Sequence, residues 1–360
     1  MKKIFTVVGA RPQFIKAAVV SRALAQNENI EEVLVHTGQH YDANMSDVFF
    51  DELHIPRPHH QLGVGGGTHG QNTGRMLEKL EALMLAEKPD WVLVYGDTDS
   101  TLAGALAASK LHIPVAHVEA GLRSFNRRMP EEINRVLTDH VSSVLFAPTA
   151  TAAKHLAHEG IAASKVHIVG DVMYDAALFY KTRAKQPTQA VGQDWAKEAF
   201  VLCTVHRAEN TDNAERMQSI LAGLASAQCQ VVLPIHPRTR ARLAQMGLKI
   251  PVNVHVIEPV SYLEMVWLEM NCRLVMTDSG GVQKEAYFHE KPCVTMRDET
   301  EWTELVELGV NRLVGVDPQQ IAKSLSMEVD CKCFQNQSVY GAGQSGILVA
   351  QYLFENQAHV

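Results

Sequence analysis

Residues 91–118 read WVLVYGDTDSTLAGALAASKLHIPVAHV, and this stretch decides the fold. Two short apolar runs, Trp91–Tyr95 and Val115–Val118, flank a segment rich in alanine and leucine. Continuous apolar strands separated by helices are typical of a parallel sheet that is covered on both faces. The stretch therefore predicts a strand, a helix and a second, parallel strand of an α/β protein.

The same alternation continues in both directions along the chain. Further strands are expected at the apolar runs Ile4–Val8, Val33–His36, Val144–Ala147, Phe200–Val205, Val231–Ile235, Val254–Ile257, Leu274–Thr277 and Cys293–Met296. A polar stretch, Lys181–Asp194, separates an early set of strands from a late set. The pattern predicts two similar α/β domains, as a chain of 360 residues allows, because one hydrophobic core seldom grows beyond roughly 250–300 residues.

The domain boundary is predicted near Gly170. We expect an N-terminal domain over residues 1–169 and a C-terminal domain over residues 170–344. The segment 345–360 begins with apolar residues at roughly helical spacing, and we expect it to form a helix that packs on the N-terminal domain.

The composition argues against several classes of partner. A formal charge of −7 and a pI near 6.2 give no general basic field, so neither nucleic acid nor an anionic membrane is expected to bind. No apolar run approaches the ~18 residues of a membrane span, and the first run is too short for a signal peptide. The six cysteines include no CxxC pair, which is typical of free thiols. We therefore expect a cytoplasmic protein.

Polar motifs follow several strands of the predicted N-terminal domain, where ligands bind in open parallel sheets. After the first strand comes Gly9–Lys16, where backbone amides at a helix start could meet an anion and Arg11 and Lys16 add positive charge. The alternative is a capped helix with two solvated cations. Three carboxylates follow later strands, namely Asp97, Glu119 and Glu131. Asp97 could instead cap a helix, and Glu131 or Glu132 could satisfy a helix dipole. Arg135 could pair with Glu131 on the surface, four residues away.

The predicted C-terminal domain carries a matching set of motifs. His206 ends one strand and is followed by Arg207, and His236 ends the next. Asp278-Ser279-Gly280-Gly281 follows a further strand, and its small residues would let backbone amides reach a pyrophosphate. Glu285 lies one to two helical turns beyond, where it could meet ribose hydroxyls. A plain glycine-rich turn is the alternative.

Two common cofactor signatures are not supported. Gly65–Gly70 matches G-x-G-x-x-G, but it follows polar residues and does not form the first turn after a strand, so no nicotinamide site is expected. The 17 histidines include no H-E-x-x-H motif, and no zinc spacing is present. We expect neither a metal nor another cofactor.

Taken together, these motifs resemble the non-hydrolysing UDP-N-acetylglucosamine 2-epimerase family. The resemblance rests on Gly9–Lys16, Gly96-Asp97-Thr98, His117–Arg123, Pro130-Glu131-Glu132, His206-Arg207 and Thr277–Gly281, in the family's order. It implies two Rossmann-like doubly wound domains in a GT-B arrangement, an active-site cleft between them, UDP held mainly by the C-terminal domain, and a homodimer. The implied reaction inverts C2 of a UDP-N-acetylhexosamine by removing the C2 proton, eliminating UDP to leave a glycal, and adding UDP back.

The resemblance also implies roles for individual residues. Proton chemistry falls to Asp97, Glu119 and Glu131, and His206 stabilises the departing UDP or shuttles a proton. The residues implied to bind the nucleotide sugar are Arg11, Lys16, Arg135, His236, Ser279, Gly280, Gly281 and Glu285.

Some segments resemble one branch of the family. Gln39-His40-Tyr41-Asp42 stands where the UDP-N-acetylglucosamine subgroup typically has Gln-His-Arg-Glu, and Trp302 stands where the family commonly has arginine. The segments His36–Met45, Gly66–Met76 and Glu299–Trp302 look most like the branch that converts UDP-2,3-diacetamido-2,3-dideoxy-glucuronate, a precursor in lipopolysaccharide O-antigen biosynthesis, to the mannuronate form. Candidate partners for its C6 carboxylate and C3 acetamide are Arg123, Arg127, Arg128 and His69. Conversion of UDP-N-acetylglucosamine to UDP-N-acetylmannosamine and a GT-B glycosyltransferase remain as alternatives.

Overall fold

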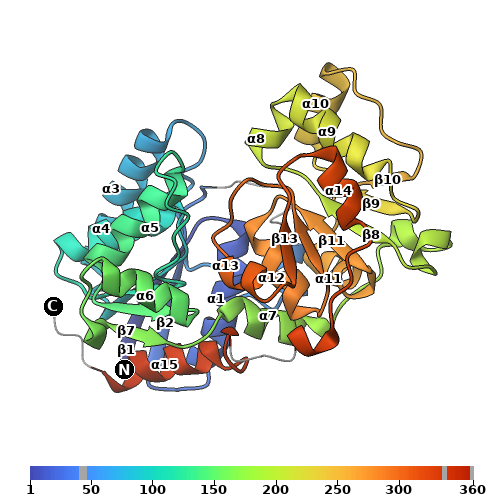
Figure 1. Ribbon diagram of the computed structural model, residues 1–360. Coiled ribbons are helices and arrows are strands. Elements are labelled where there is room, and N and C mark those ends of the chain that lie inside the picture. The colour runs from blue at the N-terminus through green and yellow to red at the C-terminus, as the bar shows by residue number, and fades with distance from the viewer. Residues whose placement is uncertain (40–46, 335–338, 357–360) are drawn as a thin grey trace. The chain divides into compact units, whose positions relative to one another are not determined.

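The computed structural model describes residues 1–39, 47–334 and 339–356, which form two compact units (Figure 1). The first unit consists of Met1–Ala176 and Ser338–Val360, and the second of Ala177–Gln337. The division falls inside helix α7 (Val172–Lys181), somewhat beyond the boundary predicted near Gly170.

The first unit is built on a parallel sheet of seven strands, in the order β3-β2-β1-β4-β5-β6-β7 among the described residues. The strands are β1 (Lys2–Val8), β2 (Ile30–His36), β3 (His60–Gln61), β4 (Trp91–Tyr95), β5 (Val115–Val118), β6 (Val144–Ala147) and β7 (Val166–Ile168). The helices are α1 (Arg11–Leu24), α2 (Asp47–Glu52), α3 (His69–Glu87), α4 (Asp99–Lys110), α5 (Pro130–Val141), α6 (Ala150–His158) and α15 (Ser345–Glu355).

The second unit repeats this plan with six strands in its described part, in the order β10-β9-β8-β11-β12-β13. The strands are β8 (Val201–Thr204), β9 (Val231–Pro234), β10 (Val254–Ile257), β11 (Leu274–Thr277), β12 (Cys293–Thr295) and β13 (Asn311–Leu313). The helices are α8 (Ala208–Thr211), α9 (Ala214–Leu224), α10 (Pro237–Gln245), α11 (Tyr262–Asn271), α12 (Gly280–Phe288), α13 (Thr303–Glu307) and α14 (Pro318–Ser324).

Alternate residues of the central strands pack into different cores, which explains why these strands are continuously apolar. In β8, Val201 and Cys203 belong to one buried cluster, whereas Leu202 belongs to another. Both faces of the sheet are therefore covered, as a parallel sheet requires. The predicted fold class, two doubly wound α/β domains, is confirmed, and every apolar run named above forms a strand.

Three strands were missed by the sequence prediction, namely β3, β7 and β13. Each is two or three residues long, lies at a sheet edge and is only partly buried, so none has an apolar run. The Gly65–Gly70 segment thus follows a short strand after all, but at the edge of the sheet.

The C-terminal helix belongs to the first unit, where the red α15 lies beside the N-terminal strand (Figure 1). Lys2 Nζ donates hydrogen bonds to the carbonyl oxygens of Leu353 and Phe354, at 3.1 and 2.6 Å. A Cβ on Gly346 would lie 2.6 Å from a methyl carbon of Val19, so glycine allows α15 to approach α1 closely.

Both sheets reverse their strand order at the first strand, which places a switch point between β1 and β4 and another between β8 and β11. Ligands of open α/β sheets bind outside the carboxyl ends of the strands at such points. No helix in the described part of the chain is both long and apolar enough to cross a membrane.

Candidate functional site

A pocket of about 220 Å³ lies at the switch point of the first unit. Residues that follow β1 and β4 line it, together with the start of α5. Of the predicted site residues, Lys16, Asp97 and Glu131 are brought together here, and we call this the carboxylate pocket. Glu119 and Arg135 contact two of these residues directly. Five of the six candidates in this unit therefore form one cluster. The sixth, Arg11, is the partly buried first residue of α1.

Gln13 occupies the backbone amides that were expected to meet an anion. Its Oε1 accepts hydrogen bonds from the amides of Gly9 at 2.8 Å and Ala10 at 3.1 Å. Its Nε2 donates to the carbonyl oxygen of Tyr95 at 2.8 Å and to Oγ1 of Thr101 at 2.9 Å. The expectation of an amide cradle after β1 is therefore wrong for Gly9 and Ala10.

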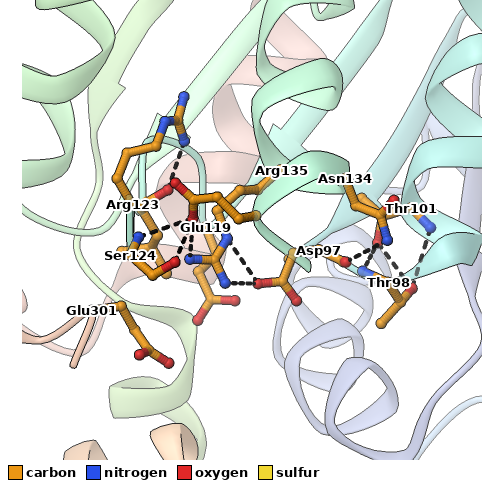
Figure 2. Close-up of polar contacts among 12 residues, drawn as sticks. Asp97, Thr98, Thr101, Glu119, Arg123, Ser124, Asn134, Arg135 and Glu301 are labelled. Carbon is orange, nitrogen blue, oxygen red and sulfur yellow. Dashed lines mark hydrogen bonds and ion pairs between the residues drawn. The ribbon is translucent and has the colours of Figure 1, made fainter. Parts of the chain in front are cut away.

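Asp97 is not the cap of α4, because Thr98 takes that role and accepts a hydrogen bond from the amide of Thr101. Figure 2 shows the guanidinium of Arg135 pointing toward the Asp97 carboxylate. Arg135 Nε donates to Asp97 Oδ2 at 3.1 Å, and Nη2 donates to the same oxygen. Asp97 is thus held by a cation while its side chain stays 28% exposed.

The two adjacent glutamates of α5 differ in their contacts. Glu132 is buried and accepts hydrogen bonds from the amides of Ser124 at 2.9 Å and Phe125 at 3.0 Å. Arg135 pairs with Glu132 at 3.2 Å, not with Glu131 as the helical spacing suggested. Glu131 lines the pocket, and no hydrogen bond to its carboxylate is found within the described residues. Glu132 is therefore structural, and Glu131 is available for chemistry.

Glu119 forms an ion pair with Lys16, and both side chains are nearly buried. Its backbone has a φ of 71°, which is uncommon for a residue with a side chain. Gly96 faces this pair, because a Cβ there would lie 3.1 Å from Glu119 Oε2 and 3.3 Å from Lys16 Nζ. The loops after β4 and β5 are thus packed tightly around the ion pair.

The structure separates the four candidate partners of a sugar carboxylate. Arg123 is buried and holds Glu159 with two hydrogen bonds of 2.7 Å each. Arg127 and Arg128 are exposed, and neither lines the pocket. His69 does line it, and its Nδ1 lies 3.1 Å from Asp99 Oδ2. His69 is therefore the one of these four that lines the carboxylate pocket.

In the second unit, the switch point brings His206 and Asp278 together. His206 Nδ1 lies 3.1 Å from Asp278 Oδ1, and the imidazole is 53% exposed whereas Asp278 is fully buried. Asp278 also accepts hydrogen bonds from the amides of His206 and Arg207. Burial alone would raise the pKa of Asp278, but the hydrogen bond and charge of His206 hold that pKa below its ordinary value of 3.8. Asp278 was quoted in the sequence motif but was not predicted as a site residue.

The N-terminus of α12 follows directly. Ser279 caps the helix by accepting from the amide of Val282. Gly280 packs closely on Glu301, whose Oε1 would lie 2.4 Å from a Cβ at that position, whereas Gly281 is exposed. Glu285 lies further along the helix and is buried. Glycine at position 280 therefore makes room for the Glu301 carboxylate, and the approach of a pyrophosphate to these residues stays a prediction.

Trp302 has a cation beside it although it replaces an arginine of the family pattern. Lys284 Nζ lies 4.0 Å from the centre of the Trp302 ring, and both side chains are buried. Arg297, equally buried, donates to Glu301 at 3.1 Å. Positive charge is therefore retained in this part of the second unit.

His236 is exposed and caps α10, since its Nδ1 accepts from the amide of Arg238 at 3.2 Å. Of the predicted segment His36–Met45, residues 40–45 lie outside the described residues. Within the described ranges, no group of three or more His, Cys, Asp or Glu side chains could hold a metal ion.

Comparison with known proteins places the chain in a family. The sequence model of UDP-N-acetylglucosamine 2-epimerases matches residues 22–354, so the chain belongs to this family and is an epimerase, a type of isomerase. The predicted family is confirmed.

Three similar proteins cover nearly the whole chain. The UDP-2,3-diacetamido-2,3-dideoxy-D-glucuronate 2-epimerase of Pseudomonas aeruginosa is 56% identical over 98% of this chain and 99% of its own length. A UDP-N-acetylglucosamine 2-epimerase homolog of Methanococcus maripaludis is 50% identical over 98% of this chain and 99% of its own. The crystal structure of the Methanocaldococcus jannaschii UDP-GlcNAc 2-epimerase in complex with UDP-GlcNAc and UDP superposes with a TM-score of 0.88. It is 44% identical and covers 99% of this chain and 100% of that one.

Proposed function

We propose that this enzyme inverts C2 of UDP-2,3-diacetamido-2,3-dideoxy-D-glucuronate and gives the mannuronate form. The observation that carries the proposal is the 56% identity, over 98% of the chain, to the Pseudomonas aeruginosa enzyme with that activity. The sequence segments that resemble this branch support the same substrate.

The proposed mechanism uses the carboxylates of the first unit for proton transfer. Inversion at C2 needs a base on one face of the sugar and an acid on the other. Of the three predicted carboxylates, Glu131 lines the pocket and has no cation partner among the described residues, whereas Asp97 and Glu119 are paired with Arg135 and Lys16. These contacts support Glu131 as one of the two proton-transfer groups, with Asp97 or Glu119 as the other.

Departure of UDP must accompany loss of the proton, because a C2 proton on a saturated sugar is barely acidic. Cations and hydrogen-bond donors stabilise the charge that develops on the leaving diphosphate. We assign this role to His206, which Asp278 orients, and to the N-terminus of α12 at Ser279, Gly280 and Gly281. The remaining nucleotide contacts are proposed for Arg11, Lys16, Arg135, His236 and Glu285.

The substrate carboxylate needs a partner that UDP-N-acetylglucosamine would not use. His69 lines the carboxylate pocket and is held by Asp99, so we assign it to the C6 carboxylate or the C3 acetamide. Arg123 is withdrawn from this role because its guanidinium is buried against Glu159.

Proton NMR in heavy water tests the proposal. The purified enzyme is given UDP-N-acetylglucosamine in one tube and the diacetamido-glucuronate nucleotide in the other, without an acceptor. Deuterium at C2 together with the manno isomer in the second tube alone supports both reaction and substrate. Turnover in the first tube would instead make it a UDP-N-acetylglucosamine 2-epimerase. Release of free sugar would indicate a hydrolysing enzyme, and silence in both would favour a glycosyltransferase.

We further propose that the enzyme is a cytoplasmic homodimer that acts in O-antigen biosynthesis. All six cysteines are free, which supports a reducing compartment. Size-exclusion chromatography with light scattering tests the dimer, and loss of O-antigen after gene deletion tests the pathway.

A further inference from the structure

His117 is a fully buried residue of β5 whose two ring nitrogens both have partners. Its Nδ1 lies 2.7 Å from Asp139 Oδ1, and its Nε2 lies 2.8 Å from the carbonyl oxygen of Gly96. These three residues come from β5, from α5 and from the loop after β4. The imidazole therefore bridges three segments of the first unit.

The identity of the partners determines the protonation state of the ring. A carbonyl oxygen can only accept, so Nε2 must carry a proton. Asp139 Oδ2 accepts from the amide of Gly121 at 3.1 Å and contacts the cationic Arg123 Nη1 at 2.7 Å, and both donors stabilise the ionised carboxylate. Nδ1 must then donate as well. Both nitrogens carry protons, and the ring is an imidazolium.

The surrounding charges balance this cation. Burial alone would raise the pKa of Asp139, but His117 and Arg123 together hold that pKa below its ordinary value of 3.8. Arg123 in turn holds Glu159, and His140 Nε2 lies 3.4 Å from the same glutamate. The chain of two cations and two carboxylates, from buried His117 to partly exposed Glu159, is therefore close to neutral. A neutral chain of this kind avoids the cost of a buried, unpaired charge.

The ring is placed to control the geometry of the carboxylate cluster. Gly96 directly precedes Asp97, and it packs against the ion pair of Glu119 with Lys16. His117 lies two residues before Glu119, and Asp139 holds the amide of Gly121 just beyond it. A shift of the ring would therefore move the loop that carries Asp97 relative to the loop that carries Glu119.

We propose that His117 is a positioning residue, held as a buried imidazolium by Asp139 and Gly96, that fixes Asp97 and Glu119 relative to each other. It touches no substrate in this role. The protonation state is independent of the function proposed above, and only the kinetic part of the test rests on that function.

Imidazole ¹⁵N NMR of the wild-type enzyme tests the protonation state. The His117 signals are assigned by their loss in His117→Gln. At about pH 7 both nitrogens are expected in the protonated range, because each faces an acceptor at 2.7–2.8 Å. Buried His289 serves as an internal control, because burial lowers its pKa to about 4 and its ring should stay neutral. A non-protonated nitrogen on His117 at about pH 7 would overturn the proposal.

Kinetics of His117→Gln test the positioning role. Glutamine cannot donate to both partners, so kcat should fall about 100-fold, whereas KM and the affinity for UDP should change little. The control is His140→Gln. His140 lies on the same helix as Asp139 and its side chain is 46% exposed, so this variant should keep wild-type activity. A kcat within about twofold of wild type, or an equal loss of UDP affinity, would contradict the role.

A second variant, Asp139→Asn, keeps the proposal testable if His117→Gln fails to fold. Asp139→Asn leaves His117 in place but removes the carboxylate, so Nδ1 should lose its proton at about pH 7 and kcat should fall as in His117→Gln. A doubly protonated His117 in this variant would contradict the proposal. If wild-type His117 is doubly protonated but the wild-type enzyme epimerises neither UDP-sugar, the function proposed above fails while the imidazolium stands.

Discussion

The imidazole of His206 and the carboxylate of Asp278 meet at the switch point of the second sheet, with Nδ1 and Oδ1 separated by 3.1 Å. The carboxylate is completely buried, and it also accepts from Asn210 Nδ2 at 3.1 Å. Asp278 thus fixes both the ring of His206 and the backbone that carries it. Because Nδ1 faces Asp278 and the imidazole as a whole is 53% exposed, we propose that Nε2 meets the ligand.

Replacement of Asp278 by asparagine should therefore impair both catalysis and folding. The asparagine side chain would place an NH2 donor where a carboxylate oxygen now accepts from buried N–H groups. The free energy of unfolding should therefore fall by about 1–3 kcal/mol. Loss of the oriented imidazole should lower kcat about 100-fold. Urea unfolding and steady-state kinetics measure the two effects. Asp298→Asn is the matched control, because Asp298 is 71% exposed, and it should change neither quantity appreciably.

Glu131 and Glu132 should give opposite results when each is changed to glutamine. Glu131→Gln should lower kcat about 100-fold or more with little effect on stability, because Glu131 faces the pocket. Glu132→Gln should lower the free energy of unfolding by about 1–3 kcal/mol, because Glu132 accepts from the buried loop at Ser124 and Phe125. Deuterium exchange at C2 and urea unfolding separate the two. Equal exchange rates in Glu131→Gln and wild type would remove Glu131 from the mechanism.

Gly96 and Gly63 have the same φ of 62° but different surroundings. Alanine at either position should cost about 1 kcal/mol of stability, since this backbone region disfavours a Cβ. Only Gly96→Ala should also reduce kcat, because its Cβ would press on Glu119 and Lys16, whereas Gly63 has open space around it. If both variants lose kcat equally, backbone strain rather than the ion pair is responsible.

Buried Glu269 should make the protein less stable as the pH rises. Burial, and secondarily the charge of Glu285, raises the pKa of Glu269 well above its ordinary value of 4.5. Above that ordinary value the unfolded chain releases the proton while the folded protein keeps it, so folding stability falls with rising pH until the folded-state pKa is passed. Glu269→Gln needs no proton and should be more stable than wild type at about pH 8, but not at about pH 4.

Urea unfolding at the two pH values measures this difference. Exposed Glu290 supplies the control, and Glu290→Gln should follow the wild type at both. A lower stability of Glu269→Gln at the higher pH would show that Glu269 is ionised and paired.

The fold could be predicted from the sequence because each long strand is marked by residues that are adjacent in the chain. Apolar runs such as Trp91–Tyr95 mark strands by themselves, and polar residues after them mark a ligand edge. Edge strands such as β7 lack that signal, because they are only partly buried and need no continuous apolar run.

The contacts within the site could not be predicted in the same way. His117 and Asp139 lie 22 positions apart, and Gln13 reaches the carbonyl oxygen of Tyr95 across 82 positions. No spacing rule links such pairs, because they meet only when strands and helices pack. Helical spacing also suggested Glu131 as the partner of Arg135, whereas packing favours Glu132 and Asp97.

The occupation of the first turn by Gln13 has an evolutionary consequence. A phosphate cradle made of backbone amides cannot change its ligand without changing its fold. Here the amides of Gly9 and Ala10 are already used, and Pro12 has none to offer. Under the function proposed above, recognition of charge at this turn would therefore rest on the exchangeable side chains of Arg11 and Lys16. A single codon change at either position would then alter the charge offered to a substrate, while the backbone of the turn keeps its hydrogen bonds to Gln13.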